Sequence, residues 1–109
     1  MAIDNSEFDI SSTLIYTEQL KAELLNSIAK LYTSMTDGEA TTSRRADLLS
    51  DIIINTYLIS DKLGVSYNAL DTKILSRIRL LLMNSEDNLA VKQDLLNLSK
   101  HIDKNRIIK

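Results

Sequence analysis

Cysteine, proline and tryptophan are absent from the 109-residue sequence, and glycine occurs only twice. The lack of cysteine excludes disulfides, thiolate zinc sites, iron–sulfur clusters and cysteine nucleophiles. The scarcity of proline, glycine and aromatic residues removes most of the turn signals on which sheets and hairpins depend. The single histidine, His101, lies near the C-terminus, which disfavours a multi-histidine metal site and an ordinary Ser-His-Asp triad. The composition therefore favours helices and excludes several classes of active site.

Strong charge of either sign and long apolar runs are also missing. Thirteen Lys and Arg residues against fifteen Asp and Glu residues give a net charge of −2, the wrong sign for a protein that binds nucleic-acid phosphates. The longest purely apolar run is the four residues 80–83, far shorter than the ~20 residues that span a bilayer. Residues 1–9 carry acidic side chains where a signal peptide needs positive charge. We therefore expect a cytoplasmic protein that binds neither nucleic acid nor membranes.

Four segments of the chain carry apolar residues at the three- and four-residue steps of an amphipathic helix. The first is predicted to start near Ser11 to Thr13, where hydroxyl groups can accept from free amide groups, and to end at about Met35. Its apolar face is predicted to comprise Leu20, Leu24, Ile28, Leu31 and Met35. The other three predicted helices span about residues 43–63, 67–83 and 89–102. The pattern predicts an all-α fold with four helices.

Glycine and short polar connections separate these helices. Gly38 is expected to supply a permissive backbone in the first connection, and Gly64 a left-handed cap after the second helix. Connections of this length suit antiparallel neighbours. We therefore predict a tail over residues 1–12, a single helical domain over 13–103 and a second tail over 104–109.

The second predicted helix is more apolar than a helix covered on one side needs to be. Its apolar face is predicted to comprise Leu48, Ile52, Ile59 and Leu63, widened by Leu49 and Ile53. The opposite polar face is predicted to comprise Arg44, Asp47, Asp51, Asn55 and Lys62. Ile54 and Leu58 fall within or beside this polar face, where a monomer would expose them. We therefore expect a homodimer or larger assembly whose interface covers both residues.

Side chains with oxygen atoms follow one side of the second predicted helix. Asp47, Asp51 and Asn55 recur at steps of four, and Glu23 with Asn26 offers further oxygen atoms on the first helix. Mg²⁺ takes oxygen ligands, and one or two carboxylates together with substrate phosphates can hold it. These residues therefore either form a metal and phosphate site between two helices or are ordinary solvent-facing residues.

Basic residues on the third predicted helix offer a second feature with two interpretations. Lys73 and Arg77 lie one turn apart and could meet a triphosphate through charge and hydrogen bonds, although surface solubility explains them equally well. The sequence has no glycine-rich phosphate loop and no nucleophile elbow. No pair of carboxylates stands out as a general acid–base dyad, so the catalytic residues are unknown.

Two segments resemble a known group of proteins. Residues Leu20–Ser27 and Asp51–Val65, the latter followed by a capped helix with Lys73 and Arg77, resemble the MazG-like, all-α nucleoside triphosphate pyrophosphohydrolase families. The resemblance covers about residues 18–83. It is strongest to the short, divergent MazG-like proteins of Gram-positive bacteria and their phages. It implies a four-helix MazG-like bundle, assembled as a dimer or larger, with a nucleotide site where helices of two protomers meet.

The resemblance also implies a metal site with fewer acids than usual. Members of these families hold Mg²⁺ with an EExxE motif on one helix and an ExxD motif on another, and cleave a nucleoside triphosphate to the monophosphate and pyrophosphate. Glu23 and Asp51 match acids of these motifs. Ala22, Asn26 and Leu48 stand where three further glutamates are expected. Weak or absent hydrolysis is therefore expected.

The first functional hypothesis is a Mg²⁺-dependent nucleotide pyrophosphohydrolase in which Glu23 and Asp51 bind the metal. Its assisting ligands would be Asp47 and Asn26, and its substrate contacts Asn55 and either Lys73 or Arg77. The second hypothesis is a non-catalytic module that binds a nucleotide without turnover. The third is a structural or partner-binding helical oligomer that uses the apolar surface around Ile54 and Leu58.

Overall fold

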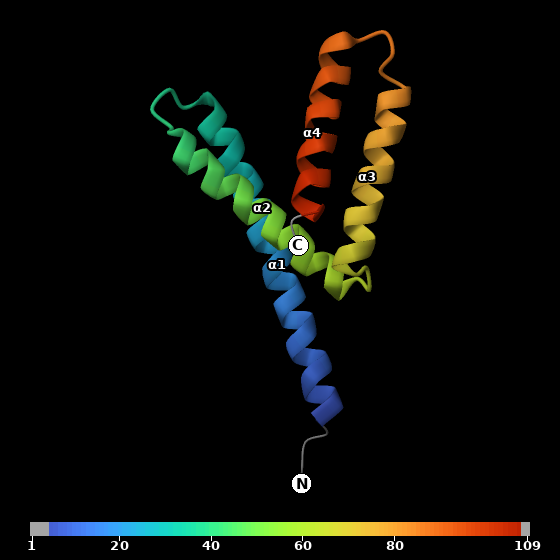
Figure 1. Cartoon of the computed structure of the whole chain (residues 1–109). Coiled ribbons are helices and arrows are strands. Elements are labelled where there is room, and N and C mark those ends of the chain that lie inside the picture. Colours follow the sequence, from blue (N-terminus) through green and yellow to red (C-terminus); the bar gives the residue numbers. More distant parts are fainter. Residues whose placement is uncertain (1–4, 108–109) are drawn as a thin grey trace. The chain divides into compact units, whose positions relative to one another are not determined.

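The helices of this chain meet no internal interruption, because proline is absent and both glycines fall between the periodic segments. The computed structural model describes the backbone of residues 5–107 and the side chains of residues 10–105. This described chain contains four α-helices and no strand (Figure 1). They are α1 (Asn5–Thr36), α2 (Thr42–Lys62), α3 (Tyr67–Met83) and α4 (Leu89–Ile107). The predicted all-α class with four helices is confirmed.

The helix boundaries agree with the sequence pattern in the middle of the chain and differ at its ends. α2 begins and ends within one residue of the prediction, and α3 matches it. α1 begins earlier and α4 ends later than predicted, so residues 5–12 and 104–107 of the predicted tails are helical. Neither stretch contains proline or glycine, so nothing in the sequence stops the helix there. Residues 1–4 and 108–109 of the predicted tails lie outside the described residues.

Local hydrogen bonds fix the two ends of α2. The Thr41 hydroxyl accepts from the backbone N–H of Arg44 at 3.0 Å and so caps the start of the helix. After its end, Gly64 has a φ of 81°, the left-handed conformation that the sequence predicts there. Gly38 lies in the first connection, as expected, but does not adopt a positive φ there. That connection turns instead on Asp37, whose Oδ1 accepts from the Glu39 N–H at 3.0 Å.

The chain divides into two compact units, with the boundary between Tyr67 and Asn68. The first unit comprises α1 and α2, and the second comprises α3 and α4. In the second unit Leu75 and Ile78 are buried. The single domain predicted over residues 13–103 stays a prediction. None of the helices, over the residues described, is long and apolar enough to cross a membrane.

The first unit is a helical hairpin in which α1 packs antiparallel against α2 (Figure 1). Leu20 and Leu48 are buried in it. The half-buried apolar residues on the two helices include Leu24, Ile28, Leu31, Ile52 and Ile59. The predicted apolar faces are therefore confirmed for the middle of both helices.

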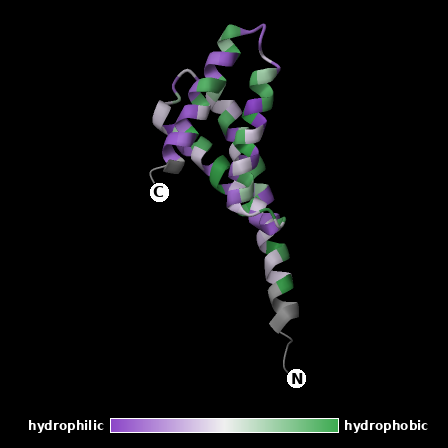
Figure 2. Ribbon diagram, turned by 45° about the vertical axis from the view of Figure 1, so that its right-hand side comes forward, coloured by the Kyte–Doolittle hydropathy of each residue, from purple (hydrophilic) through white to green (hydrophobic). Residues whose placement is uncertain are grey.

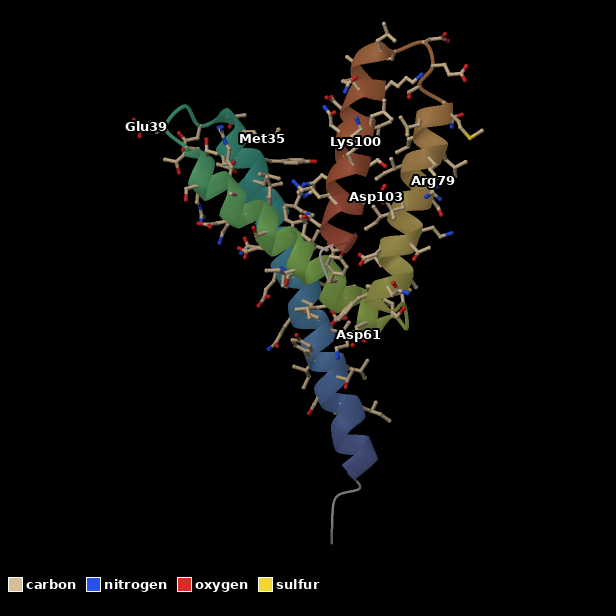
Figure 3. The ribbon with its side chains drawn as sticks, in the orientation of Figure 1. Met35, Glu39, Asp61, Arg79, Lys100 and Asp103 are labelled. Atoms are coloured by element: carbon tan, nitrogen blue, oxygen red, sulfur yellow. The ribbon has the colours of Figure 1, made fainter. Side chains whose placement is uncertain are left out.

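The contact between α1 and α2 is narrower than the sequence suggests. Met35 is 65% exposed and lies beside the connection that carries Glu39 (Figure 3). Ser34 is buried instead, because a step of three residues from Leu31 returns to the contact face. The predicted apolar residues Leu49, Ile53 and Leu63 are also exposed. Hydrophobic residues thus extend beyond the buried contact (Figure 2), and the predicted widening of the α2 face is wrong.

Two side-chain contacts between α1 and α2 set the register of the hairpin. An Arg45 Nη2 group donates to the Ser34 carbonyl at 2.7 Å, close to the connection. Towards the other end, Lys62 Nζ lies 5.3 Å from the centroid of the Tyr16 ring, a cation–π contact. Because both helices advance at the same rise per residue, the levels in between follow from these two contacts. Glu23 is therefore level with Asn55, and Asn26 and Ser27 are level with Asp51.

Candidate functional site

A pocket of about 460 Å³ lies between α1 and α2 and gathers most of the oxygen-bearing residues that the sequence singles out. Its polar lining comprises Glu23, Asn26, Ser27 and Lys30 from α1, and Asp51 and Asn55 from α2. Its apolar lining comprises Tyr16, Leu20, Ile54 and Leu58. We call this the acidic pocket. Four of the predicted ligand and substrate residues, Glu23, Asn26, Asp51 and Asn55, are thus brought together.

Helical geometry explains why Glu23 and Asp51 line the same pocket. Glu23 follows the buried Leu20 by three residues, and Asp51 follows the buried Leu48 by three. A step of three turns each acid about 60° away from the contact face, in the same sense on both helices. In an antiparallel pair, equal rotations of this kind bring both side chains to the same side of the contact. The two acids therefore converge although 28 residues separate them in the sequence.

Both carboxylates are available to a ligand. Glu23 and Asp51 are exposed, and neither forms an ion pair or a side-chain hydrogen bond with any residue that the structure describes. Other acids of the hairpin do pair, since Glu18 contacts Lys21 at 2.9 Å and Asp61 contacts Lys62 at 3.5 Å. Two unpaired carboxylates on one pocket offer oxygen ligands to a cation.

Asn55 is the most deeply placed polar residue of the acidic pocket. Its side chain is only 7% exposed, yet its amide has no hydrogen-bond partner among the described residues. The amide atoms are not fully enclosed, so they open into the pocket. Because these atoms face the pocket and have no protein partner, a ligand in the pocket can form hydrogen bonds with them.

The burial of Asn55 corrects its predicted place on the solvent-facing side of the helix. Eight residues of α-helix turn through 800°, so Asn55 lies about 80° from Asp47 around α2 rather than in line with it. Seven residues bring it to within about 20° of Leu48, on the face that contacts α1. Asn55 thus replaces an apolar residue in the helix contact.

Sequence reasoning missed Ser27, Lys30 and Tyr16 as members of this site. Lys30 follows Glu23 by seven residues, so it lies two turns further along the same side of α1. That spacing was visible in the sequence, but the register of α2 against α1 was not. Ile54 and Leu58 were expected to lie in an interface between protomers, and both line the acidic pocket. Ile54 is 54% exposed and Leu58 is half-buried.

Three predicted site residues do not line the acidic pocket. Asp47 is exposed one turn before Asp51 on α2 and is not part of the lining. Lys73 and Arg77 are exposed on α3, in the second unit. Their assignment to phosphate binding stays a prediction.

The donor set suits one hard cation rather than a cluster of metal ions. No group of three or more His, Asp or Glu residues that could hold a metal occurs in the described ranges. Two carboxylates and two side-chain amides remain in the acidic pocket. Mg²⁺ is commonly bound by one or two carboxylates, with its other positions filled by water and phosphate oxygens. The residues present therefore fit a single Mg²⁺ ion that arrives with a phosphorylated ligand.

Comparison with known families finds one match. A family model described as the MazG-like family matches residues 10–95, which include all of the acidic pocket. No curated protein and no solved structure matches the chain.

Replacing Asn55 by Leu should stabilise the protein by about 1 kcal/mol, because an apolar side chain at this position extends the apolar contact with α1. Chemical denaturation measures this change. The matched variant Asn26→Leu, at an exposed position of the same pocket, should change the stability by less than about 0.5 kcal/mol. A clear loss of stability in Asn55→Leu would show that the amide has a structural role.

Proposed function

Since the chain belongs to the MazG-like family, we propose that it binds a nucleoside triphosphate together with Mg²⁺ in the acidic pocket and cleaves it slowly to the monophosphate and pyrophosphate. One observation carries this proposal. Glu23 and Asp51, the residues that match acids of the two family motifs, line one pocket from two different helices. A pair of chance surface acids on separate helices would have no reason to converge.

Within this proposal Glu23 and Asp51 hold the Mg²⁺ ion, and the amide oxygens of Asn26 and Asn55 assist. When bound, Mg²⁺ neutralises phosphate charge and activates water. Asn55 contributes an amide at the bottom of the pocket, where a ligand oxygen or hydroxyl group can complete its hydrogen bonds. Lys30 offers a positive charge within the same lining. We assign no ligand role to Asp47, because it lies outside the lining.

Slow cleavage follows from the residues at the remaining motif positions. Ala22 and Leu48 supply no oxygen ligand, and Leu48 is 2% exposed in the contact between α1 and α2. Each missing carboxylate removes a metal ligand and part of the charge that attracts the cation. A site with two acids therefore binds Mg²⁺ more weakly than one with five.

Binding of a nucleotide without turnover is the second candidate. It is favoured because no group of three or more acids that could hold a metal occurs among the described residues. Both candidates require the same pocket and the same two carboxylates. They differ only in whether pyrophosphate is released.

Mg²⁺ and a nucleoside triphosphate should stabilise the wild-type protein, and Glu23→Gln or Asp51→Asn should remove most of that effect. A ligand at one hundred times its Kd adds about 2.7 kcal/mol to the stability. Thermal unfolding with a panel of ribo- and deoxyribonucleoside triphosphates, with and without MgCl₂, provides the measurement. A parallel assay of pyrophosphate release then separates slow cleavage from binding alone.

The controls for this experiment are Asp47→Asn and Glu18→Gln, which remove a carboxylate from the same helices outside the pocket. Both should respond to the triphosphate like the wild type. The proposal is wrong if no triphosphate stabilises the protein and none is cleaved at high enzyme concentration.

A homo-oligomer is the third part of the proposal. Ile54 is exposed at the acidic pocket, and burial of such an apolar side chain against a second copy is favourable. A partner placed there would also close the apolar end of the pocket. This places the subunit contact and the nucleotide site together, as the family resemblance implies.

Ile54→Lys should convert an oligomer into a monomer, because a charge at the contact is not paired. Analytical ultracentrifugation at micromolar concentration measures the state. Ile53→Lys is the matched control, since Ile53 is equally exposed but does not line the pocket. A monomeric wild type, unchanged by Ile54→Lys, would contradict the proposed assembly.

A further inference from the structure

The acidic pocket continues into a second cavity along the same helix pair. This cavity, of about 340 Å³, lies between the C-terminal part of α1 and the start of α2. Its lining includes Lys30 and Thr33 of α1, Arg44 of α2 and Asp37 of the connection. Because Lys30 lines both spaces, the two are neighbours along the hairpin, and we refer to them together as the groove. We call the second space the basic cavity.

The two cations of the basic cavity are free to bind an anion. In the ranges that the structure describes, neither the Lys30 nor the Arg44 side chain has an ion pair or a hydrogen bond. The lining also contains one acid, Asp37, which accepts from the Glu39 N–H group through Oδ1 and leaves a net charge of +1 with the two cations. The start of α2 adds partial positive charge at this end of the groove.

Chemical character changes in a fixed order along the groove. Tyr16, Leu20 and Leu58 make one end apolar. Glu23 and Asp51 follow in the middle. By the register of the hairpin, Lys30 lies one turn beyond the level of Asp51, and Arg44 about one turn further. These steps place the cations about 5 Å and about 10 Å along the helix axis from Asp51.

We propose that the groove binds the nucleoside triphosphate in one direction, with the nucleoside at Tyr16 and Leu58 and the terminal phosphate at Lys30 and Arg44. This inference rests on the proposed function and adds the orientation of the ligand. The metal-bound phosphates then lie at Glu23 and Asp51. The span from Asp51 to the two cations is of the order of a triphosphate chain, and the long Lys and Arg side chains close the remaining distance.

The opposite direction is unfavourable on physical grounds. It places a polyanion against Tyr16, Leu20 and Leu58, where the nearby cation, Lys62, already contacts the Tyr16 ring and lies 3.5 Å from Asp61. It also places the nucleoside between two unpaired cations, which favour phosphate oxygens as partners. The order of charge along the groove thus selects one orientation.

Inorganic tripolyphosphate tests the basic cavity without any contribution from a base or sugar. In MgCl₂, calorimetric titration should show that Lys30→Ala and Arg44→Ala each raise the Kd for tripolyphosphate about tenfold, as expected for loss of one charge-assisted hydrogen bond. Lys21→Ala is the matched control on α1, since Lys21 pairs with Glu18 outside the groove. Its Kd should equal that of the wild type.

The apolar end gives the complementary test. Tyr16→Ala should weaken binding of the triphosphate that gives the largest thermal shift in the panel, but should leave the Kd for tripolyphosphate unchanged. Circular dichroism verifies that each variant keeps its helices. Lys30→Gln, which retains most of the aliphatic side chain, repeats the test with less disturbance of packing.

The outcomes separate this inference from the proposed function. If nucleotides bind through Glu23 and Asp51 while Lys30→Ala and Arg44→Ala bind tripolyphosphate like the wild type, the orientation is wrong and the proposed function stands. A Tyr16→Ala variant that loses tripolyphosphate binding also overturns the orientation. If the wild type binds neither nucleotides nor tripolyphosphate, both fail.

Discussion

The antiparallel contact between α1 and α2 is the constraint on which the candidate site depends. Leu20 and Leu48 are the most deeply buried apolar residues of this hairpin, and each is followed by an acid three residues later. Burial of the leucines therefore sets where the carboxylates of Glu23 and Asp51 lie. The Arg45 contact with Ser34 and the Lys62 contact with Tyr16 hold the register between the two ends. A different register would change the distance between the two acids along the helix axis.

A polar residue within that contact indicates a conflict between stability and function. Asn55 occupies a position that leucine would fill with greater stability, yet its amide opens into the acidic pocket. Proteins retain such groups where a ligand needs them, at a cost to the folded state. The proposed metal site has only two acids, so the amide of Asn55 is a more important contact for the proposed ligand. The groove thus has few carboxylate ligands, and its unpaired cations lie at one end, where they favour phosphate binding.

The sequence predicted the helices well because their signals are local. Apolar spacing and the Gly64 cap identified α2 and α3 almost to the residue. The start of α1 was predicted too late and the end of α4 too early. Neither end carries a proline or glycine that would mark the boundary in the sequence. Four of the proposed ligand and substrate residues line the acidic pocket because they follow helical periodicity on α1 and on α2.

Other features of the site depend on the register between helices, which no local pattern encodes. Lys30 and Tyr16 line the site because of the way α2 packs against α1, which the sequence pattern does not show. Asn55 was assigned to the wrong face because each step of four residues rotates a side chain by about 40° around the helix. Two such steps place Asn55 about 80° from Asp47. Asp47 was included through the same step and lies outside the pocket. The roles of Lys73 and Arg77 depend on where the second unit lies relative to the first. The spacing of apolar residues does not show this.

A double-mutant cycle tests most directly whether Glu23 and Asp51 act on the same Mg²⁺-bound nucleotide. The free energy of binding is measured by titration for the wild type, Glu23→Gln, Asp51→Asn and the variant with both changes. Shared ligation predicts that the double variant loses little more than either single variant, with a coupling of about 1 kcal/mol or more. Losses that simply add, or single variants that bind like the wild type, would show that the two acids do not form one site.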